Sequence, residues 1–397
     1  MKSNRALFII GFVAPFIFVG IMSVHLNAFG VFGSKEFKTS DRTRMINAFS
    51  ILHKKPRGLV MGASTASMID PNHPGWNSDA KPVVQANTNF AMFYENLRTF
   101  QHAQATTQVK QVVVDLLFVT HLIEKKGQHD FSESRLRTDE NGKLISLPMY
   151  FIKIFPDVHA ALFSEKSLRH IVNLFLDLTG FQSYALNTKE SLDPYVRTKH
   201  FNRSFFPPTG YCKSFSSNRE EIRQRIAMFV EIARENQTDL RMFIEPFHAR
   251  KMEKNQTGEC WEPYKLWIRD MVDVLAEDRR NHPEEKPFQL WNFSGYNSIT
   301  KEPITPLNEE YVSDMHWYRD AIHYRKPTGL LILDRIFDYD HPDRKVPDDF
   351  GVLLTEENVE DHLKGFEQGM QEYQKTRAAD FIDGETFYSL MKKVSRD

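Results

Sequence analysis

The chain has 397 residues, with 51 lysines and arginines against 52 aspartates and glutamates, and it has only 2 cysteines. This length can bury a large core and allows one large domain or two ordinary ones. The balanced charge excludes a generally basic nucleic-acid-binding protein, so no nucleic-acid partner is expected. Two cysteines exclude a disulfide-rich scaffold and a four-cysteine zinc site.

An uncharged apolar run from Ala6 to Val24 predicts an N-terminal transmembrane helix. At 1.5 Å per residue the run would span roughly 28 Å, enough to cross a bilayer core. Lys2 and Arg5 precede it, so the positive-inside rule predicts a cytoplasmic N-terminus and an exported body. A cleaved signal peptide is the alternative, although the residues after the run form a poor cleavage site.

Export bears on the two cysteines, Cys212 and Cys260. In an oxidising compartment two thiols could pair, but a sequence does not show whether they meet. A disulfide and two unpaired small residues therefore both stay open.

The rest of the chain alternates predicted helices and strands. Expected helices cover residues 43–53, 91–107, 217–236, 262–278, 330–337 and 356–375, and expected strands cover residues 58–61, 110–118, 240–244 and 288–293. A capping-box pattern from Ser217 to Glu220 marks the start of the third helix. This alternation predicts an α/β fold with a parallel sheet flanked by helices. Residues 124–208 fit the pattern poorly and are expected to form an insertion over the carboxyl edge of the sheet.

A serine follows the first predicted strand directly, in Gly62-Ala63-Ser64. In open α/β sheets, ligands bind at the carboxyl ends of the strands, so the Ser64 hydroxyl could face a substrate crevice. Its N–H could also point towards an oxyanion. From these three residues alone, an ordinary turn that caps the next helix explains the pattern better.

A second motif near the end of the chain places Asp320 and His323 three residues apart. Such spacing can hold the carboxylate against one imidazole nitrogen and leave the other to take a proton from a hydroxyl. A serine hydroxyl needs such a base to become an effective nucleophile. The order Ser, Asp, His on a parallel α/β frame makes the two motifs more informative together than apart.

These motifs resemble the SGNH (GDSL-like) hydrolase superfamily, in the membrane-anchored, exported branch that includes the D-alanyl transfer protein of teichoic acid assembly. The matching residues are Gly62-Ala63-Ser64, Asp320-Ala321-Ile322-His323 and the later Gly329. The resemblance covers roughly residues 57 to 340. It implies a flavodoxin-like three-layer sandwich, with no cofactor and no metal. The implied organisation is an anchor with its flanks (1–33), a tether and first helix (34–56), an SGNH-hydrolase-like domain with insertions (57–345) and a C-terminal helical extension (346–397).

The resemblance also implies catalytic roles, with Ser64 as the nucleophile, His323 as the general base and Asp320 as the residue that orients it. The oxyanion hole of the family uses the serine N–H, a glycine N–H from a second block and an asparagine side chain from a third.

This sequence departs from the family in both of those blocks. The second block, residues 84–90, has no glycine, and the third, residues 115–118, has no asparagine. The Asn87 backbone or the Asn89 side chain could substitute, and losing one donor typically costs roughly 10²–10³ in rate.

Other residues offer further candidates. Asp314 and His316 have the spacing of another acid–base pair, but no glycine and helix follow them as in the family. Together with His323 they could suggest a metal, but no second carboxylate–histidine cluster stands nearby, so none is expected. His248 follows a strand and should face the same crevice, either to bind substrate or to support the structure.

The expected function is that of a membrane-anchored serine acyl esterase or O-acyltransferase acting on a cell-envelope or exported polysaccharide. We expect a single-pass protein of the bacterial cytoplasmic membrane with a periplasmic or extracytoplasmic catalytic domain. Its partners would be an acylated or acyl-accepting envelope glycan and, by family analogy, a membrane acyl-donor protein. The alternative is a catalytically inactive relative that serves as a binding or scaffold subunit of an envelope polysaccharide assembly complex.

Overall fold

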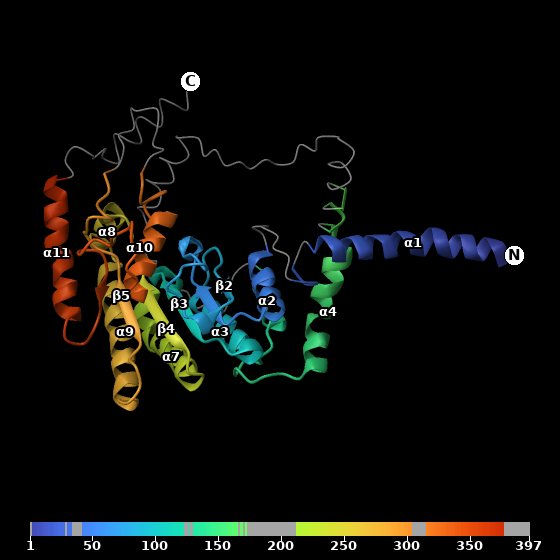
Figure 1. Cartoon of the computed structure of the whole chain (residues 1–397), viewed down its shortest axis with the longest axis horizontal. Coiled ribbons are helices and arrows are strands. Elements are labelled where there is room, and N and C mark those ends of the chain that lie inside the picture. The colour runs from blue at the N-terminus through green and yellow to red at the C-terminus, as the bar shows by residue number, and fades with distance from the viewer. Residues whose placement is uncertain are drawn as a thin grey trace, which may run out of the picture. The chain divides into compact units, whose positions relative to one another are not determined.

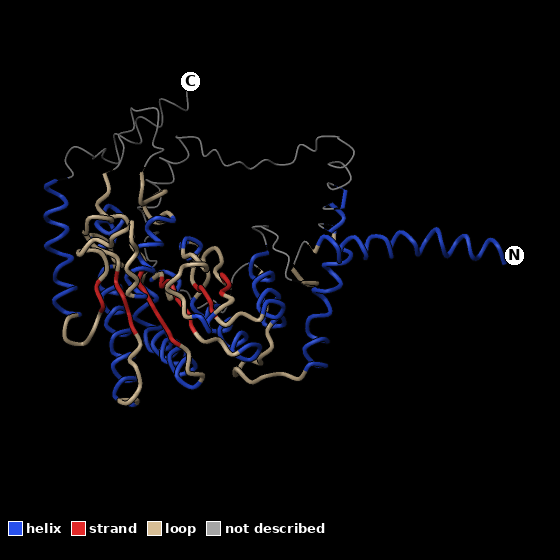
Figure 2. Tube along the Cα trace, viewed as in Figure 1, coloured by secondary structure: helices blue, strands red, loops and turns tan. Residues whose placement is uncertain are grey.

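The computed structural model describes residues 2–27, 30–33, 42–122, 127, 130–165, 167–169, 171–172, 212–303 and 315–376. Six strands form one sheet in the order β2-β1-β3-β4-β5-β6. The strands are β1 (Gly58–Met61), β2 (Val83–Gln85), β3 (Gln111–Leu116), β4 (Asp239–Ile244), β5 (Gln289–Asn292) and β6 (Val352–Leu353). Strand β1 pairs in parallel with β2 and β3, and β4 pairs in parallel with β5. The mostly parallel sheet with flanking helices confirms the expected α/β class (Figures 1 and 2).

The longer strands coincide with the predicted ones because they are runs of buried apolar residues. Every residue of β1 and β3 is buried, and β3 contains three consecutive valines, which suit a strand covered on both faces. Two short strands were not predicted. Strand β2 has only three residues, and β6 has two residues that pair antiparallel with β5.

The chain divides into two compact units. Unit 1 consists of Met1–Ser67, Trp76–Ser191 and Gln224–Leu240, and unit 2 consists of Met68–Gly75, Leu192–Arg223 and Arg241–Asp397. Each is described by itself below.

Helices α2 (Thr43–Lys54), α3 (Phe93–Thr107) and α4 (Leu147–Phe163) belong to unit 1 (Figure 1). Helix α2 buries Met45 and Phe49 in a core cluster with residues of α4. The buried His102 of α3 lies 3.0 Å from the Ala48 carbonyl of α2, which joins these two helices. The described part of the expected insertion therefore contains a helix that packs on α2, and residues 173–211 lie outside the described residues.

Helix α1 extends over Lys2–Leu26, and its side chains are described from Ala14 onwards. Within the part of the chain that the structure describes, no helix has the length and apolarity needed to cross a membrane. The C-terminal half of α1 packs on α4, where the Ser23 hydroxyl donates a 2.8 Å hydrogen bond to the Leu162 carbonyl.

Unit 2 contains α8 (Ala249–Gln256), α9 (Trp261–Asn281), α10 (Lys326–Phe337) and α11 (Val359–Thr376). Helix α11 lies beside α9 (Figure 1), and Arg269 of α9 forms an ion pair with Glu360 of α11 at 2.6 Å. A disulfide joins Cys212 to Cys260 immediately before α9, which settles the pairing that the sequence left open.

Helix α7 (Lys213–Glu235) begins in unit 2, four residues before the predicted capping box. The prediction that Ser217 caps the helix is therefore wrong, because Ser217 lies inside its second turn. The disulfide at Cys212 and the buried Phe215 fix the chain upstream of that serine, so the helix extends back to them.

Candidate active site

Ser64 lies on a tight turn at the carboxyl end of β1, in unit 1. Gly62 opens the turn with φ +140°, and a Cβ at Gly62 would lie 2.7 Å from the Asp115 carbonyl oxygen of β3. After the serine, the Ser67 N–H (3.2 Å) and hydroxyl (2.6 Å) both donate to the Ser64 carbonyl. Ser64 itself is half-buried. The turn thus holds a serine at the edge of the sheet where parallel strands bind ligands.

Replacing Gly62 with alanine is expected to destabilise the protein by roughly 2 kcal/mol, because it adds both backbone strain and a clash with β3. Urea unfolding monitored by circular dichroism measures the loss. Gly365 on α11 is the matched control, since nothing lies within 4 Å of a Cβ built there. Gly365→Ala should leave the free energy of unfolding unchanged or raise it slightly. Equal stability of the two variants would contradict the proposed constraint at Gly62.

Asn87 of the second block lies against the serine turn. Its side-chain Nδ2 donates to the Ala63 carbonyl at 3.4 Å, next to Ser64. Asn47 of α2 fixes the position of this residue by donating from Nδ2 to the Asn87 carbonyl at 3.0 Å. Asn89 is exposed. Of the two asparagines suggested by the sequence, Asn87 is therefore the one placed beside the turn.

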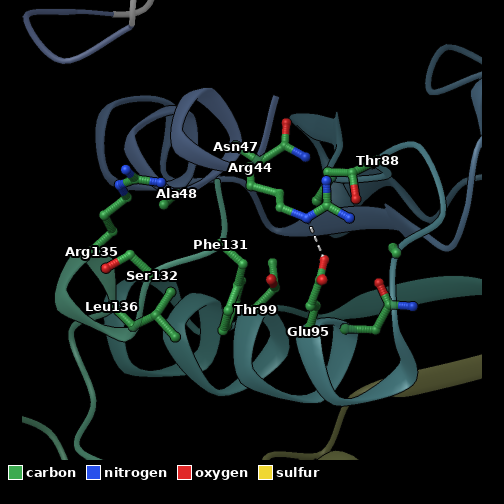
Figure 3. A pocket seen from close by; sticks show the side chains of 13 residues that line it. Arg44, Asn47, Ala48, Thr88, Glu95, Thr99, Phe131, Ser132, Arg135 and Leu136 are labelled. Carbon is green, nitrogen blue, oxygen red and sulfur yellow. Dashed lines mark hydrogen bonds and ion pairs between the residues drawn. The ribbon is translucent and has the colours of Figure 1, made fainter. Parts of the chain in front are cut away.

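Arg44 of α2 anchors the second block from the other side (Figure 3). Its Nε lies 2.6 Å from the Glu95 carboxylate, a buried pair, and its Nη2 donates to the Asn89 carbonyl at 3.0 Å. The cavity beside this pair holds only about 20 Å³ of open space. It also includes the buried Thr88 hydroxyl, which has no hydrogen-bond partner among the described residues. That volume fits one water molecule and is too small for a substrate, so this region supports the loop and is not itself the substrate site.

Asp115 is the one polar side chain of the third block, and it is buried. Leu116, Leu117 and Phe118 are all buried apolar residues at the end of β3. The third block therefore has no asparagine of the family type. Beside the serine turn, unit 1 offers the Ser64 N–H and the Asn87 side chain as candidate donors.

Asp320 and His323 lie on a tight turn in unit 2. Asp320 Oδ2 lies 2.8 Å from His323 Nδ1, and Asp320 Oδ1 accepts hydrogen bonds from the N–H groups of Ile322 (2.9 Å) and His323 (2.8 Å). A carboxylate only accepts hydrogen bonds, so Nδ1 carries the proton in this contact. The nitrogen that can take a proton from another group is then Nε2. The predicted pairing of these two residues is confirmed.

The pKa of Asp320 lies below its ordinary value of 3.8. Burial acts to raise this pKa, but the hydrogen bonds and the attraction from His323, together with the Ile322 N–H, outweigh it. The carboxyl is therefore ionised at neutral pH. It can hold the imidazole in one tautomer and stabilise the imidazolium that proton uptake produces.

Glu302 shapes the segment that leads into this turn. Its carboxylate accepts the N–H groups of His316, Trp317 (3.0 Å) and Tyr318 (3.1 Å). Burial raises the pKa of Glu302, while these three bonds act to lower it. No sequence pattern links residue 302 to residues 316–318, so this support was not predicted.

His248 is fully buried at the start of α8, and both of its ring nitrogens are bonded. Its Nδ1 accepts from the Arg250 N–H at 3.2 Å, and its Nε2 donates to the Glu302 carbonyl at 2.8 Å. Burial lowers its pKa to about 4. Of the two roles that the sequence left open, this environment favours structural support over substrate binding.

The low pKa of His248 predicts a pH-dependent stability. The unfolded chain protonates this histidine near its ordinary pKa of 6.5, whereas the folded chain does so only near 4. Its contribution to stability is therefore full above pH 6.5 and is lost as the pH falls towards 4. Urea unfolding at a series of pH values should show a smaller decline over this range in His248→Asn than in the wild type. An unchanged decline would mean that the titration of His248 does not contribute.

The segment directly after the serine turn belongs to unit 2 and packs on α10, the helix that follows His323. A Cβ at Gly329 of α10 would meet the Met68 carbonyl. Lys326 pairs with Asp70 at 3.1 Å, and His73 bonds Asp334 at 2.9 Å. Within unit 2, three contacts therefore fix residues 68–75 to the helix that begins three residues after His323.

The alternative acid–base pair of Asp314 and His316 stays a prediction, because Asp314 lies outside the described residues. The His316 backbone N–H is bonded to Glu302. Among the described residues, no group of three or more His, Cys, Asp or Glu side chains is arranged to hold a metal ion. Ser64 and Asn87 belong to unit 1, whereas Asp320, His323 and His248 belong to unit 2.

No protein-family model matches this chain, and no curated protein sequence matches it either.

Proposed function

We propose that this chain is a membrane-anchored serine acyl esterase or O-acyltransferase that acts on a cell-envelope or exported polysaccharide. The observation that carries the proposal is the contact between the buried Asp320 carboxylate and His323 Nδ1 at 2.8 Å. Serine hydrolases hold their base in this arrangement, in which Nδ1 faces the carboxylate and Nε2 is the nitrogen that can accept a proton.

The topology of the sheet supports Ser64 as the nucleophile. The order β2-β1-β3-β4-β5 is that of a flavodoxin-like sandwich, in which ligands bind where the strand order reverses, between β1 and β3. Ser64 follows β1 by three residues, and Gly62 keeps the end of β3 close to the turn.

In the proposed reaction, the Ser64 hydroxyl attacks an ester carbonyl while His323 Nε2 takes its proton. The Ser64 N–H and the Asn87 side chain would stabilise the oxyanion that forms. Collapse of this intermediate breaks the ester bond, and His323 returns the proton to the leaving alcohol. Water or a glycan hydroxyl then attacks the acyl-serine, with His323 again as the base, and restores the free serine.

The disulfide between Cys212 and Cys260 supports export, because such bonds persist in oxidising compartments. We place the globular body on the outer side of a bacterial cytoplasmic membrane, with the uncharged run from Ala6 to Val24 as the anchor. A membrane-held acyl donor protein and an envelope glycan are the partners that this location suits.

One observation favours a second candidate function, that of an inactive binding or scaffold subunit. The buried Leu116, Leu117 and Phe118 leave no side-chain donor where the family places an asparagine. The Asp320–His323 contact argues against this candidate, since a subunit without chemistry has no need of an oriented base.

A fluorophosphonate probe tests the proposal on the full chain in detergent. We expect it to label the wild type at Ser64, and we expect Ser64→Ala and His323→Ala to abolish labelling. Ser216→Ala is the matched control, because it removes an exposed hydroxyl of α7 that has no proposed role, and it should remain labelled. Absence of labelling in a folded wild type, also with the membrane fraction added back, would exclude the enzyme and favour the scaffold.

A further inference from the structure

Helix α4 is apolar on two opposite sides. On its inner side, Tyr150, Ile154 and Ala161 are buried in the core of unit 1, where they join Met45 and Phe49 of α2. An ordinary surface helix of a water-soluble protein carries charged residues opposite such a face. This helix does not follow that pattern.

The opposite side of α4 is exposed and consists mainly of large hydrophobic residues. Phe151, Ile152 and Phe155 have exposed fractions of 62%, 69% and 65%. With the exposed Leu147 and Phe163 they repeat at helical spacing, and these five residues are called here the outer stripe of α4. No lysine, arginine, aspartate or glutamate belongs to it.

The charged residues of α4 lie off the outer stripe. Asp157 is turned towards Arg135, whose Nε lies 3.0 Å from its carboxylate, and Lys153 is half-buried. The exposed side is therefore apolar apart from one polar residue, His159, whose ring centroid lies 5.5 Å from that of Phe163. Contiguous exposed apolar patches on soluble proteins usually mark a protein or membrane contact.

The outer stripe continues onto α1. The Phe163 ring meets the Phe16 ring edge-on, with centroids 6.4 Å apart. An open groove of about 440 Å³ between the two helices is lined only by apolar residues. These are Phe16, Ile17, Gly20, Ile21, Val24, Leu162 and Phe163. Figure 1 shows α1 and α4 crossing steeply at this point.

We propose that the outer stripe of α4 lies in the membrane interface beside α1, with lipid acyl chains against it and in the groove. This inference rests on the anchor that is part of the proposed function. Helix α1 contains the uncharged run that forms the proposed anchor. Lipid around the exposed side chains of α1 would therefore also contact the outer stripe of α4, which adjoins α1. The steep crossing suits one helix that enters the bilayer and another that lies in its surface.

The chemistry of the groove favours lipid over a protein occupant. Protein interfaces carry about one hydrogen bond per 100–200 Å² and a polar rim. None of the seven groove residues has a polar side chain, and acyl chains require none.

The position of α4 links this surface to the candidate active site. Helix α4 packs on α2, and α2 holds the second block through Arg44 and Asn47. A lipid-bound α4 would therefore set unit 1, with Ser64, close to the membrane surface. That position fits a substrate that is itself held by the membrane.

Lipid-borne quenchers test the inference on the full chain. The native cysteines form a disulfide, so a single added cysteine can be labelled with an environment-sensitive fluorophore under non-reducing conditions. The test variant is Ile152→Cys. The matched control is Met228→Cys, because Met228 is an exposed hydrophobic residue of α7 outside the outer stripe. Both proteins are reconstituted into vesicles of phosphatidylcholine and phosphatidylglycerol.

At Ile152 we expect the fluorophore to emit at shorter wavelength, and we expect spin-labelled phospholipid to quench most of this emission. Quenching by aqueous iodide should be several-fold weaker at Ile152 than at Met228. Iodide quenching at both positions, with no effect of the lipid quencher, would overturn the inference. Blue-shifted emission that neither agent quenches would also overturn it, since a protein partner or a second copy would then cover the stripe.

Two parallel measurements separate this inference from the proposed function. Carbonate extraction of the wild type tests the anchor alone, and fluorophosphonate labelling tests the catalytic serine alone. If the protein resists carbonate extraction but the lipid quencher has no effect at Ile152, the role of α4 is overturned and the anchor is retained.

Discussion

Asp320→Asn is expected to lower acyl-transfer activity by roughly 10⁴-fold, as loss of the carboxylate does in serine hydrolases that share this arrangement. The wild-type carboxylate accepts the His323 Nδ1 proton together with two backbone N–H groups. An asparagine keeps one oxygen for the backbone but turns an NH₂ group towards Nδ1. The imidazole would then adopt the other tautomer, with the proton on Nε2, where it cannot accept one from Ser64.

The measurement is the rate of hydrolysis of a chromogenic acyl ester or, if none is cleaved, the rate of fluorophosphonate labelling. Asp343→Asn is the control, because it makes the same change of charge at an exposed residue of unit 2 and should retain full activity. The thermal unfolding of both variants must be compared with that of the wild type, to separate a lost role from a lost fold. A folded Asp320→Asn variant with wild-type rates would contradict the assignment of the base.

Removing the disulfide between Cys212 and Cys260 is expected to cost about 4 kcal/mol in the free energy of unfolding. The bond closes a loop with a sequence separation of 48 residues, and without it the unfolded chain regains the entropy of that loop. The loop includes α7, β4 and α8 and contains residues of both units, so the bond constrains the unfolded chain of each.

Urea unfolding of the wild type and of the Cys212→Ala, Cys260→Ala double variant measures this difference. Addition of a reductant should shift the wild-type transition towards that of the double variant and leave the double variant unchanged. Coincident transitions of the oxidised wild type and the double variant would show that the loop is already restricted in the unfolded chain.

The long, buried strands of the sheet could be predicted from the sequence, whereas the short strands could not. Strands β1 and β3 are buried along their whole length, and β4 is buried at four of its six residues, so each appears in the sequence as an apolar run. Strand β2 escaped prediction because three residues after a proline carry almost no periodicity, and only pairing with β1 makes them a strand. Helix α4 escaped because it is apolar on two sides, so its sequence lacks the one-sided pattern by which helices are identified.

The candidate site was predictable where its residues are close in the chain. Asp320 and His323 are three residues apart, and their contact follows from a single turn. The roles of Glu302 and Arg44 depend on partners 14 to 51 residues away and on a chain path that the sequence does not reveal. For His248 the sequence suggested a position facing the crevice, because it follows a strand. In the structure it is buried, and both of its ring nitrogens are hydrogen-bonded to backbone groups.

Neither unit is one continuous stretch of chain. The backbone passes from one to the other at Ser67–Met68, at Gly75–Trp76 and at Leu240–Arg241, and α7 is itself divided after Arg223. A single cut at any of these points leaves no fragment that contains one whole unit and nothing of the other, so neither unit can be produced as a simple fragment. In particular, a fragment that starts at Arg241 would contain Asp320 and His323 but would lack residues 68–75, which cover α10. The two units must therefore be produced from one chain, and a truncation meant to keep unit 2 whole has to retain the eight residues after the serine turn.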